Sequence, residues 1–248
     1  MAESNVRGLS IAAKSTFLLG KHKWTIDGDS DCSTEAEKDT SKYLKLTGCV
    51  EGDFTCDDGQ CVTMEQRCNQ LPDCRDLSDE ENCSILGFGT SYNMNIPPVI
   101  SQEKKVNISI SIDLLKIVDI KEEEYSIQFS ISLQWKENRV KYHNLKTKTA
   151  LNALTYADFS KLWLPKVVYE NTDQKATTRL GEVGNGEWET RVVVKRERNF
   201  TRSELNVVDE IEVFEGSENS LIMNQTYTHE FQCSFDFSRY PFDHQVHL

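Results

Sequence analysis

The sequence lacks any long apolar run. Its apolar stretches, such as Phe17-Leu18-Leu19, fall far below the about 20 consecutive apolar residues that a membrane-spanning helix needs. The first residues carry no basic start, and no apolar core precedes a small-residue cleavage site, so a secretory signal is missing too. We therefore expect a membrane to be reached only through segments absent from this chain. We interpret the chain as a fragment, or as a gene model missing both ends.

An excess of basic residues is also missing. Lysine and arginine number 28 against 40 acidic residues, which gives a net charge of −12. A nucleic-acid surface needs a basic face, so we expect no nucleic-acid partner. The acidic balance suits cationic ligands, calcium or basic partners.

Catalytic motifs are absent as well. The sequence contains no nucleophile elbow, no HExxH and no phosphate loop. Gly181, Gly184 and Gly186 form a glycine cluster, but no Lys-Ser/Thr follows it, so a turn explains it better. We expect that the protein is not an enzyme.

Cysteine, in contrast, is concentrated in one short segment. Of eight cysteines, six lie between Cys49 and Cys83, while Cys32 and Cys233 stand alone. The gaps between the six contain no CxxC unit, the usual mark of a zinc site, so the pattern favours disulfides formed in an oxidising compartment. So short a segment cannot bury enough apolar surface to fold unaided, and crosslinks and a metal must supply the rest.

Acidic residues crowd the end of this segment. Asp73, Asp76, Asp79 and Glu80 would repel one another in so small a unit, and a hard divalent cation with oxygen ligands removes that conflict. A solvated acidic loop is the alternative. The six cysteine spacings and the Ser78-Asp79-Glu80 ending make residues 49–83 resemble the LDL-receptor class A repeat.

The resemblance implies both the disulfide pairs and a calcium site. The pairs are Cys49–Cys61, Cys56–Cys74 and Cys68–Cys83, which the spacing alone could not select. The calcium ligands would be four side chains and two backbone carbonyls: Asn69, Asp73, Asp79 and Glu80, with Gln66 and Leu71. Asn69 stands where the family usually has aspartate, so we expect weaker calcium binding. Gln66 takes the place of an aromatic residue beside which the family often captures a partner lysine. A structural spacer and a lysine trap both stay open.

Period-2 alternation marks the second half of the chain. Apolar and polar residues alternate over 106–114 and again over 125–135, which predicts half-buried antiparallel strands with one face in a core. Little helix is predicted. The fold class is therefore mainly β, an antiparallel, Ig-like β-sandwich beside the small disulfide-rich module.

The remaining segments divide the chain. Residues 1–48 stay unassigned, with strands predicted around Trp24 and Leu44 and the remnant of a lectin-like domain as a hypothesis. Residues 84–99 hold two glycines and Pro97-Pro98, and we interpret them as a linker to a domain over 100–248.

From Tyr92 onward the chain resembles the extracellular domain of Cys-loop receptors, which are pentameric ligand-gated ion channels. The motifs that carry the resemblance are Pro97-Pro98, the segments 134–140 and 162–168, and the block from Cys233 to Gln245. The resemblance implies a ligand-binding domain that is truncated at its C-terminus. It also implies a signature loop with Cys233, Tyr240, Pro241, Phe242 and Asp243 at the membrane end. His247 replaces the second cysteine of that loop, so Cys233 is free, pairs with Cys32, or marks a wrong terminal exon.

The same comparison gives ligand-pocket candidates. Ser130 stands where amine-binding members carry an aromatic residue, and Glu170 replaces another aromatic, with Tyr169 one place early. Half of an aromatic cage for a quaternary ammonium is thus missing, and a conventional acetylcholine site is unsupported. Three sequons predict N-glycosylation at Asn107, Asn199 and Asn224.

Two functions follow as hypotheses. The leading one is the extracellular part of a homo- or hetero-pentameric channel subunit at the outer side of the plasma membrane. Its small-molecule or protein ligand is unidentified. The alternative is a secreted binding or adhesion protein that reuses the sandwich without a pore.

Overall fold

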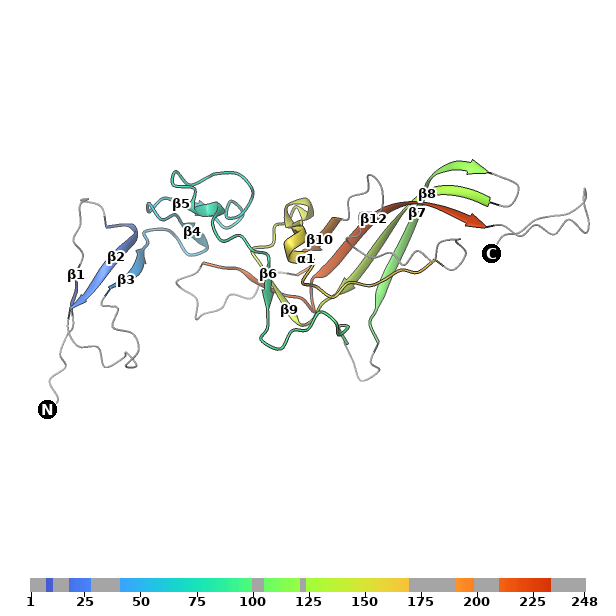
Figure 1. Ribbon diagram of the computed structural model, residues 1–248. Coiled ribbons are helices and arrows are strands. Elements are labelled where there is room, and N and C mark those ends of the chain that lie inside the picture. Colours follow the sequence, from blue (N-terminus) through green and yellow to red (C-terminus); the bar gives the residue numbers. More distant parts are fainter. Residues whose placement is uncertain are drawn as a thin grey trace, which may run out of the picture. The chain divides into compact units, whose positions relative to one another are not determined.

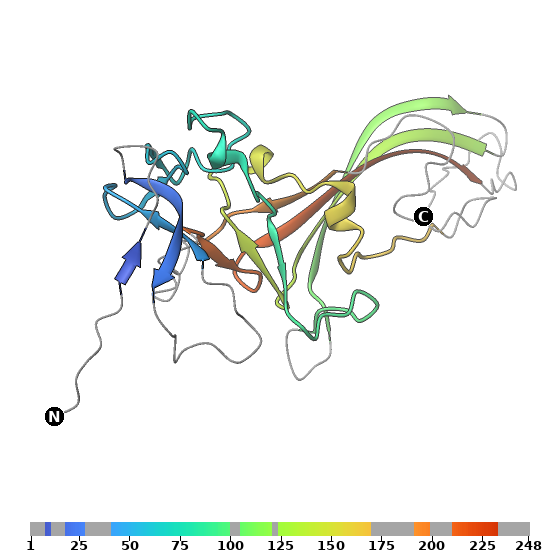
Figure 2. The ribbon, with the colours of Figure 1, turned by 60° about the vertical axis from the view of Figure 1, so that its left-hand side comes forward.

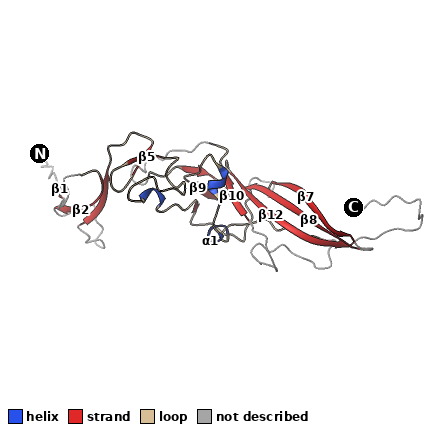
Figure 3. Ribbon diagram, turned by 90° about the horizontal axis from the view of Figure 1, so that it is seen from above, coloured by secondary structure: helices blue, strands red, loops and turns tan. Residues whose placement is uncertain are grey.

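A computed structural model describes residues 8–10, 18–27, 41–99, 105–120, 124–169, 191–198 and 210–232. Within these ranges, most of the regular structure is antiparallel strand, with one short α-helix and two 3₁₀ helices (Figure 3). The chain forms two compact units, residues 1–84 with 202–212 and residues 85–201 with 213–248.

The first unit combines a three-stranded sheet with the cysteine-rich module. The sheet contains β1 (Gly8–Ser10), β2 (Gly20–Asp27) and β3 (Ser41–Leu46), which confirms the strands predicted around Trp24 and Leu44. The module contains the hairpin of β4 (Asp53–Thr55) and β5 (Cys61–Thr63), followed by the 3₁₀ helix η1 (Ser78–Glu80). Phe54, Val62 and the half-cystines Cys56 and Cys74 are its whole buried apolar cluster among the described residues.

The β2–β3 hairpin is fastened to the module by polar contacts. The ammonium groups of Lys21 and Lys45 lie 3.0 and 3.1 Å from the Asp57 carboxylate. Burial alone would raise the pKa of Asp57, but the hydrogen bonds and charges of both lysines outweigh it and lower that pKa. Lys45 also donates to the Thr55 carbonyl at 2.7 Å, and the hydroxyls of Thr47 and Thr55 lie 2.7 Å apart.

A glycine in the hairpin allows it to approach the module this closely. Gly20 has a φ of +93°, and a Cβ there would lie 2.3 Å from the Asp57 carbonyl oxygen. Next to it, the Lys21 amide donates to the same carbonyl at 2.8 Å. A side chain at position 20 would therefore break the contact between hairpin and module.

The second unit is a sandwich of two antiparallel sheets (Figure 1). One has the order β10-β12-β8-β7, with β7 (Ile108–Ile120), β8 (Glu124–Lys136), β10 (Arg191–Lys195) and β12 (Ser220–Gln232). The other has the order β11-β9-β6, with β6 (Leu86–Phe88), β9 (Val140–His143) and β11 (Val213–Glu215). The 3₁₀ helix η2 (Thr149–Asn152) and helix α1 (Tyr156–Phe159) lie between β9 and β10 in the chain.

Strand β6 corrects the interpretation of 84–99 as a linker. Residues 86–88 pair with β9, and the Leu86 side chain is buried in the sandwich core. The glycine that suggested a linker, Gly87, lies against the His143 ring, and a Cβ there would lie 2.7 Å from the ring unless His143 moved. The sandwich therefore begins before Pro97-Pro98.

Strand β8 lies at the centre of the core, as its alternation predicts. One face of the strand is buried against the second sheet, and the register pairs it with β12 and β7 along its length. The core side chains come from both sheets: Leu86, Phe129, Ile131, Leu133, Trp135, Val140, Tyr142, Val192, Val194, Phe214, Leu221 and Met223. Both the strand and the sandwich that the sequence predicts are confirmed.

Strand β7 differs from the prediction of a half-buried strand. It is the edge strand, and Ile110, Ile112 and Leu114 are 63%, 62% and 61% exposed although they pair with buried residues of β8. Two register shifts interrupt the pairing after Leu114 and after Ile117, and β7 curves together with β8 and β12 (Figure 2). These β-bulges break the alternation beyond position 114.

An ion pair secures the turn after β8. The Glu137 carboxylate is fully buried, and Arg139 donates to it from Nε and Nη2, at 2.7 Å each. The Arg139 guanidinium also lies over the Tyr92 ring, 4.8 Å from its centroid, and the Tyr92 hydroxyl accepts from the Trp163 amide at 2.8 Å. This network ties the segment before β7 to the loop around Trp163.

Glu137 and Arg139 differ in burial, and replacing each of them should therefore lower the unfolding free energy by a different amount. R139M leaves the Glu137 carboxylate buried without its cation, which we expect to cost about 3–5 kcal/mol of unfolding free energy. E137Q leaves an arginine that is already 25% exposed and free to hydrate, so we expect a loss of about 1–2 kcal/mol. Urea unfolding followed by tryptophan fluorescence measures both. Equal losses would contradict this account.

Candidate functional site

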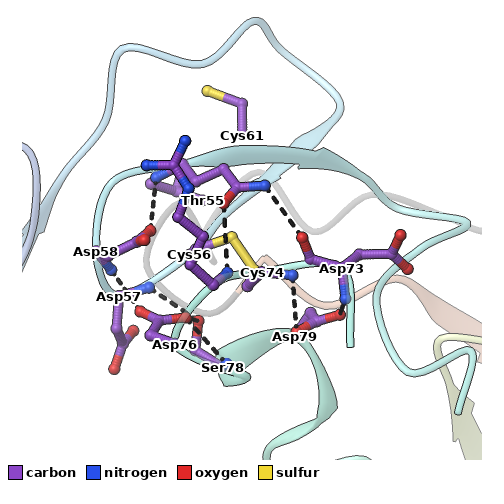
Figure 4. Close-up of a disulfide and its surroundings, with 12 residues drawn as sticks. Thr55, Cys56, Asp57, Asp58, Cys61, Asp73, Cys74, Asp76, Ser78 and Asp79 are labelled. Carbon is purple, nitrogen blue, oxygen red and sulfur yellow. Dashed lines mark hydrogen bonds between the residues drawn. A yellow bond between two sulfur atoms is a disulfide. The ribbon is translucent and has the colours of Figure 1, made fainter. Parts of the chain in front are cut away.

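The acidic end of the module gathers around a buried carboxylate. Asp79 is fully buried, and its two carboxylate oxygens accept from the backbone amides of Asp73 and Cys74, at 2.7 and 3.2 Å (Figure 4). The nearby Arg67 guanidinium does not bond this carboxylate. Its Nη1 donates to the carbonyls of Ser78 and Asp79 instead, at 2.9 and 2.6 Å.

The other ligand residues implied by the resemblance lie beside Asp79. The Asp73 carboxylate accepts from the side-chain amides of Gln66 and Asn69, at 2.8 and 2.9 Å. Glu80 Oε1 accepts from the backbone amides of Asn69 and Gln70, and the side-chain oxygen Oδ1 of Asn69 accepts from the Leu71 amide. The carboxylates of Asp73, Asp79 and Glu80 thus each accept from neutral N–H groups, and among the described residues their oxygens do not all lie within 4.8 Å of one another. Oxygen ligands of this kind suit a hard divalent cation.

A second acidic group beside the module's disulfide does not fit a metal. Cys56, Cys74 and Asp76 bring two sulfurs and a carboxylate within 4.8 Å of one another. Both sulfurs are joined in a disulfide and provide no thiolate. The Asp76 carboxylate serves as a cap, because it accepts from the Asp58 and Ser78 amides.

Three disulfides crosslink this module. They join Cys49 to Cys61, Cys56 to Cys74 and Cys68 to Cys83, the pairs that the resemblance implies. With Phe54 stacked between Lys45 and Arg67, at 4.6 and 4.3 Å from its ring centroid, they replace the apolar core that the module lacks.

The structure separates the ligand-pocket candidates of the sandwich. Ser130 follows Phe129 on β8, so the two side chains point to opposite faces of the sheet. The Tyr169 ring packs edge-on against Phe129, with centroids 5.7 Å apart, on the core side. One copy of the domain therefore cannot use both Ser130 and Tyr169 in one pocket.

The other predicted residues of the sandwich fall in two groups. Asn107 and Asn224 are described and exposed. The described ranges do not include Glu170, Cys233, Tyr240, Pro241, Phe242, Asp243 and Asn199.

Tyr169 belongs to an aromatic cluster that the sequence analysis missed. Its ring lies 4.7 Å from His229, 5.9 Å from Tyr227 and 6.2 Å from Phe231, measured between centroids. The last three side chains alternate along β12, and that period-2 pattern was visible in the sequence. The Tyr169 hydroxyl and His229 Nε2 are buried and find no hydrogen-bond partner among the described residues.

Burial governs the ionisation of this cluster. Burial raises the pKa of Tyr169, and the neighbouring Tyr227 raises it further. Burial lowers the pKa of His229. Both side chains are therefore neutral near pH 7, and the cluster offers neutral aromatic faces rather than charge.

The sandwich matches a known family. Residues 85–246 match the model of the neurotransmitter-gated ion-channel ligand-binding domain. The chain belongs to this family. Residues 47–83 match the low-density lipoprotein receptor domain class A, so a class A module precedes the ligand-binding domain. The family model begins at residue 85, consistent with the placement of β6 in the sandwich.

Curated proteins resemble shorter stretches of the chain. A vitellogenin receptor of Solenopsis invicta is 40% identical over 57 residues, which are 23% of this chain and 3% of that protein. The basement membrane-specific heparan sulfate proteoglycan core protein of Mus musculus is 53% identical over 36 residues, 14% of this chain and 1% of that protein. The CD320 antigen of Homo sapiens is 37% identical over 76 residues, 29% of this chain and 26% of that protein.

Within the described ranges, no helix has the length and apolar character that crossing a bilayer requires.

His229 gives the ligand-binding domain a predictable pH response. Its folded pKa lies below the unfolded value of 6.5, so its contribution to stability is complete above pH 6.5 and is lost as the pH falls toward the folded pKa. We expect H229N to flatten the fall in the urea midpoint between about pH 7.5 and pH 5.5. T228A, at an exposed neutral residue next to His229 on β12, is the control and should keep the wild-type slope. An unchanged slope in H229N would contradict the prediction.

Proposed function

We propose that the chain is the extracellular ligand-binding region of a ligand-gated ion-channel-like receptor subunit, preceded by a calcium-stabilised class A module. The observation that carries the proposal is the family match over residues 85–246, which coincides with a two-sheet sandwich around the β8 core. The three disulfides support an extracellular or secreted location, because they persist in oxidising compartments.

The separation of Ser130 and Tyr169 supports assembly of several copies. The two side chains lie on opposite faces of the β8 sheet, so a ligand that contacts both must bridge two copies of the domain. Ligand binding between neighbours would favour one of two arrangements of the sandwich. In a complete subunit, the loop with Tyr240-Pro241-Phe242 would pass that change to a pore.

The ligand remains to be identified, but its chemistry is constrained. Ser130 and Glu170 stand at two positions where the family's aromatic cage has aromatic residues, so half of a cage for a quaternary ammonium is missing. The net charge of −12 favours a cationic or basic ligand through long-range attraction.

A secreted binding or adhesion protein without a pore is the second candidate. The likeness to a basement membrane proteoglycan core protein favours it. In this alternative the same two domains would bind a partner, and no conformational change would reach a membrane.

The complete transcript distinguishes the two. Four apolar segments of about 20 residues downstream of the sandwich would support the channel subunit. A stop codon soon after the sandwich would contradict it and support the secreted protein. Light scattering on the purified protein adds a second criterion, because five associated copies are expected only for the pentameric reading.

We also propose that the class A module binds calcium through Asn69, Asp73, Asp79, Glu80 and the carbonyls of Gln66 and Leu71. The support is the hydrogen bonding that links these residues: Asp79 accepts from the Asp73 amide, Asp73 accepts from the Gln66 side chain, and Glu80 accepts from the Asn69 amide. Bound calcium would compensate the negative charge of the buried Asp79. It would stabilise the module by about 2.7 kcal/mol at a hundredfold excess over the dissociation constant.

Asn69 provides the sharpest test of this site. N69D removes the amide that donates to Asp73 and sets two carboxylates side by side, so the metal-free module should become less stable. With calcium, the added charge should tighten binding about tenfold. Calorimetric titration and unfolding in EDTA measure the two effects.

E65Q is the matched control, since Glu65 is an exposed acidic residue of the same module. It should leave the calcium affinity near its wild-type value. Equal affinity of N69D and the wild type would argue against Asn69 as a ligand.

A further inference from the structure

A cavity of about 190 Å³ lies between the β2–β3 hairpin and the class A module, both of which belong to the first unit. At about 30 Å³ for each water molecule, it has room for about six waters or for a small organic ion. The hairpin lines it with one face, since Lys21 pairs directly with Lys45 and Tyr43 lies two residues from Lys45. The lining residues of the module include Phe54, Asp57 and Arg67. We call this space the Arg67 cavity.

The Arg67 guanidinium is fixed in the wall of the cavity. The residue is only 6% exposed, and the guanidinium lies over the Phe54 ring, 4.3 Å from its centroid. Its hydrogen-bond partners among the described residues are the carbonyl oxygens of Ser78 and Asp79, and its Nε is buried and finds no partner there. A buried charge whose partners are all neutral is unfavourable. Arg67 is therefore the group in the cavity wall that most lacks an anion.

The two lysines of the hairpin differ in how far their charges are matched. Lys45 Nζ donates to the Thr55 carbonyl and lies 3.1 Å from the Asp57 carboxylate and 4.0 Å from that of Glu210. Lys21 Nζ donates to Asp57 at 3.0 Å, and its side chain is 44% exposed. An ammonium group has three donors, so Lys21 can serve a further acceptor.

The lining of the cavity carries a positive balance. Lys21, Lys45 and Arg67 contribute three positive charges, against two negative charges from Asp57 and Glu81. The chain as a whole has a net charge of −12, but charges beyond a Debye length of about 8 Å are largely screened at physiological ionic strength. The nearest groups decide which ion the cavity favours, and they favour an anion with a single charge.

The donor geometry selects a carboxylate among such anions. A guanidinium presents its N–H groups in a planar fork that matches the two oxygens of a carboxylate. The same surroundings already accommodate a carboxylate of the chain itself, because Glu210 accepts from the Thr55 amide at 2.9 Å beside Lys45.

We propose that the Arg67 cavity binds a carboxylate, with Arg67 and Lys21 as its donors and the Phe54 ring as its wall. The carboxylate belongs to a small organic acid or to an acidic side chain of a partner, since both offer the same group. This site goes beyond the proposed function. It uses neither Ser130 and Tyr169 nor the proposed calcium ligands, and it needs only one copy of the chain.

Titration with a minimal probe tests the site. The ¹⁵N-labelled, disulfide-bonded chain is titrated with sodium acetate at constant ionic strength, and the Nε–Hε signal of Arg67 is followed by NMR. We expect a saturating shift with a dissociation constant of about 1 mM, as suits so small a ligand. Acetamide has nearly the same shape without the charge and should leave the signal in place. A signal that acetate does not move, or that acetamide moves equally, would overturn the proposal.

Variants assign the donors, with the backbone amide of Thr55 as the signal that all of them share. R67K keeps a positive charge but loses the planar fork, so the acetate affinity should fall about tenfold. K21Q should lower it about threefold, because Lys21 is partly exposed. K42Q is the matched control, since the exposed Lys42 pairs with Trp24 on the other face of the hairpin. Equal affinities of K21Q and K42Q would overturn the assignment of Lys21 even if R67K failed to fold.

Two peptides distinguish the sources of the carboxylate. A blocked tripeptide with a central glutamate is compared with the same tripeptide carrying glutamine. If the glutamate peptide moves the Arg67 signal as acetate does and the glutamine peptide does not, the cavity accepts an acidic side chain of a partner. If acetate alone moves the signal, the cavity accepts a free small acid.

The outcomes also separate this site from the earlier proposals. Failure of acetate to bind would leave the channel-subunit proposal standing, because the family match covers the sandwich. It would leave the calcium proposal standing as well, because neither Arg67 nor Lys21 is among the proposed calcium ligands.

Discussion

The two-residue period of β8 is the constraint on which the ligand-binding domain depends. Because neighbouring side chains of an extended strand point to opposite faces, Trp135 and Phe129 in the core fix Ser130 and Ser132 outside it. The register then transfers this division to β7 and β12. It places Tyr169 and the aromatic cluster of β12 on one side of the sheet and the sequon at Asn224 on the other. A shift of one residue would bury the serines and expose the core.

The class A module is subject to a different constraint, because it has little apolar surface to bury. Phe54 and Val62 are joined by half-cystines in the buried cluster, and Phe54 is stacked between two cationic side chains. Crosslinks restrict the unfolded chain, and in the proposed site a bound cation would offset the repulsion between the carboxylates. The buried Asp79 illustrates this balance, since backbone amides rather than a lysine or arginine satisfy its oxygens.

Sequence reasoning succeeded where a local pattern determines the structure. The alternation over 125–135 predicted β8, and the cysteine spacings with the Ser78-Asp79-Glu80 ending led to the disulfide framework. It failed where the outcome depends on distant neighbours. The alternation in β7 could not reveal an edge position that leaves Ile112 exposed, and Gly87 suggested a linker although β9 pairs with it. Nor could local pattern show that Tyr169 and Ser130 lie on opposite faces, since the strand that separates them is remote from Tyr169 in the chain.

The contact between the β2–β3 hairpin and the module bears on where the module ends. The match to the family model starts at residue 47, yet Lys21 and Lys45, which precede it, form ion pairs with Asp57. Gly20 also precedes it and lies against the Asp57 carbonyl oxygen. A repeat cut out at its family boundary would lose these partners and expose the Phe54 ring on the side that Lys45 covers. The free energy of any cation captured by the acidic loop would be shared with the hairpin by thermodynamic linkage. The stretch that the family model matches and the compact unit of the structure are therefore not the same part of the chain.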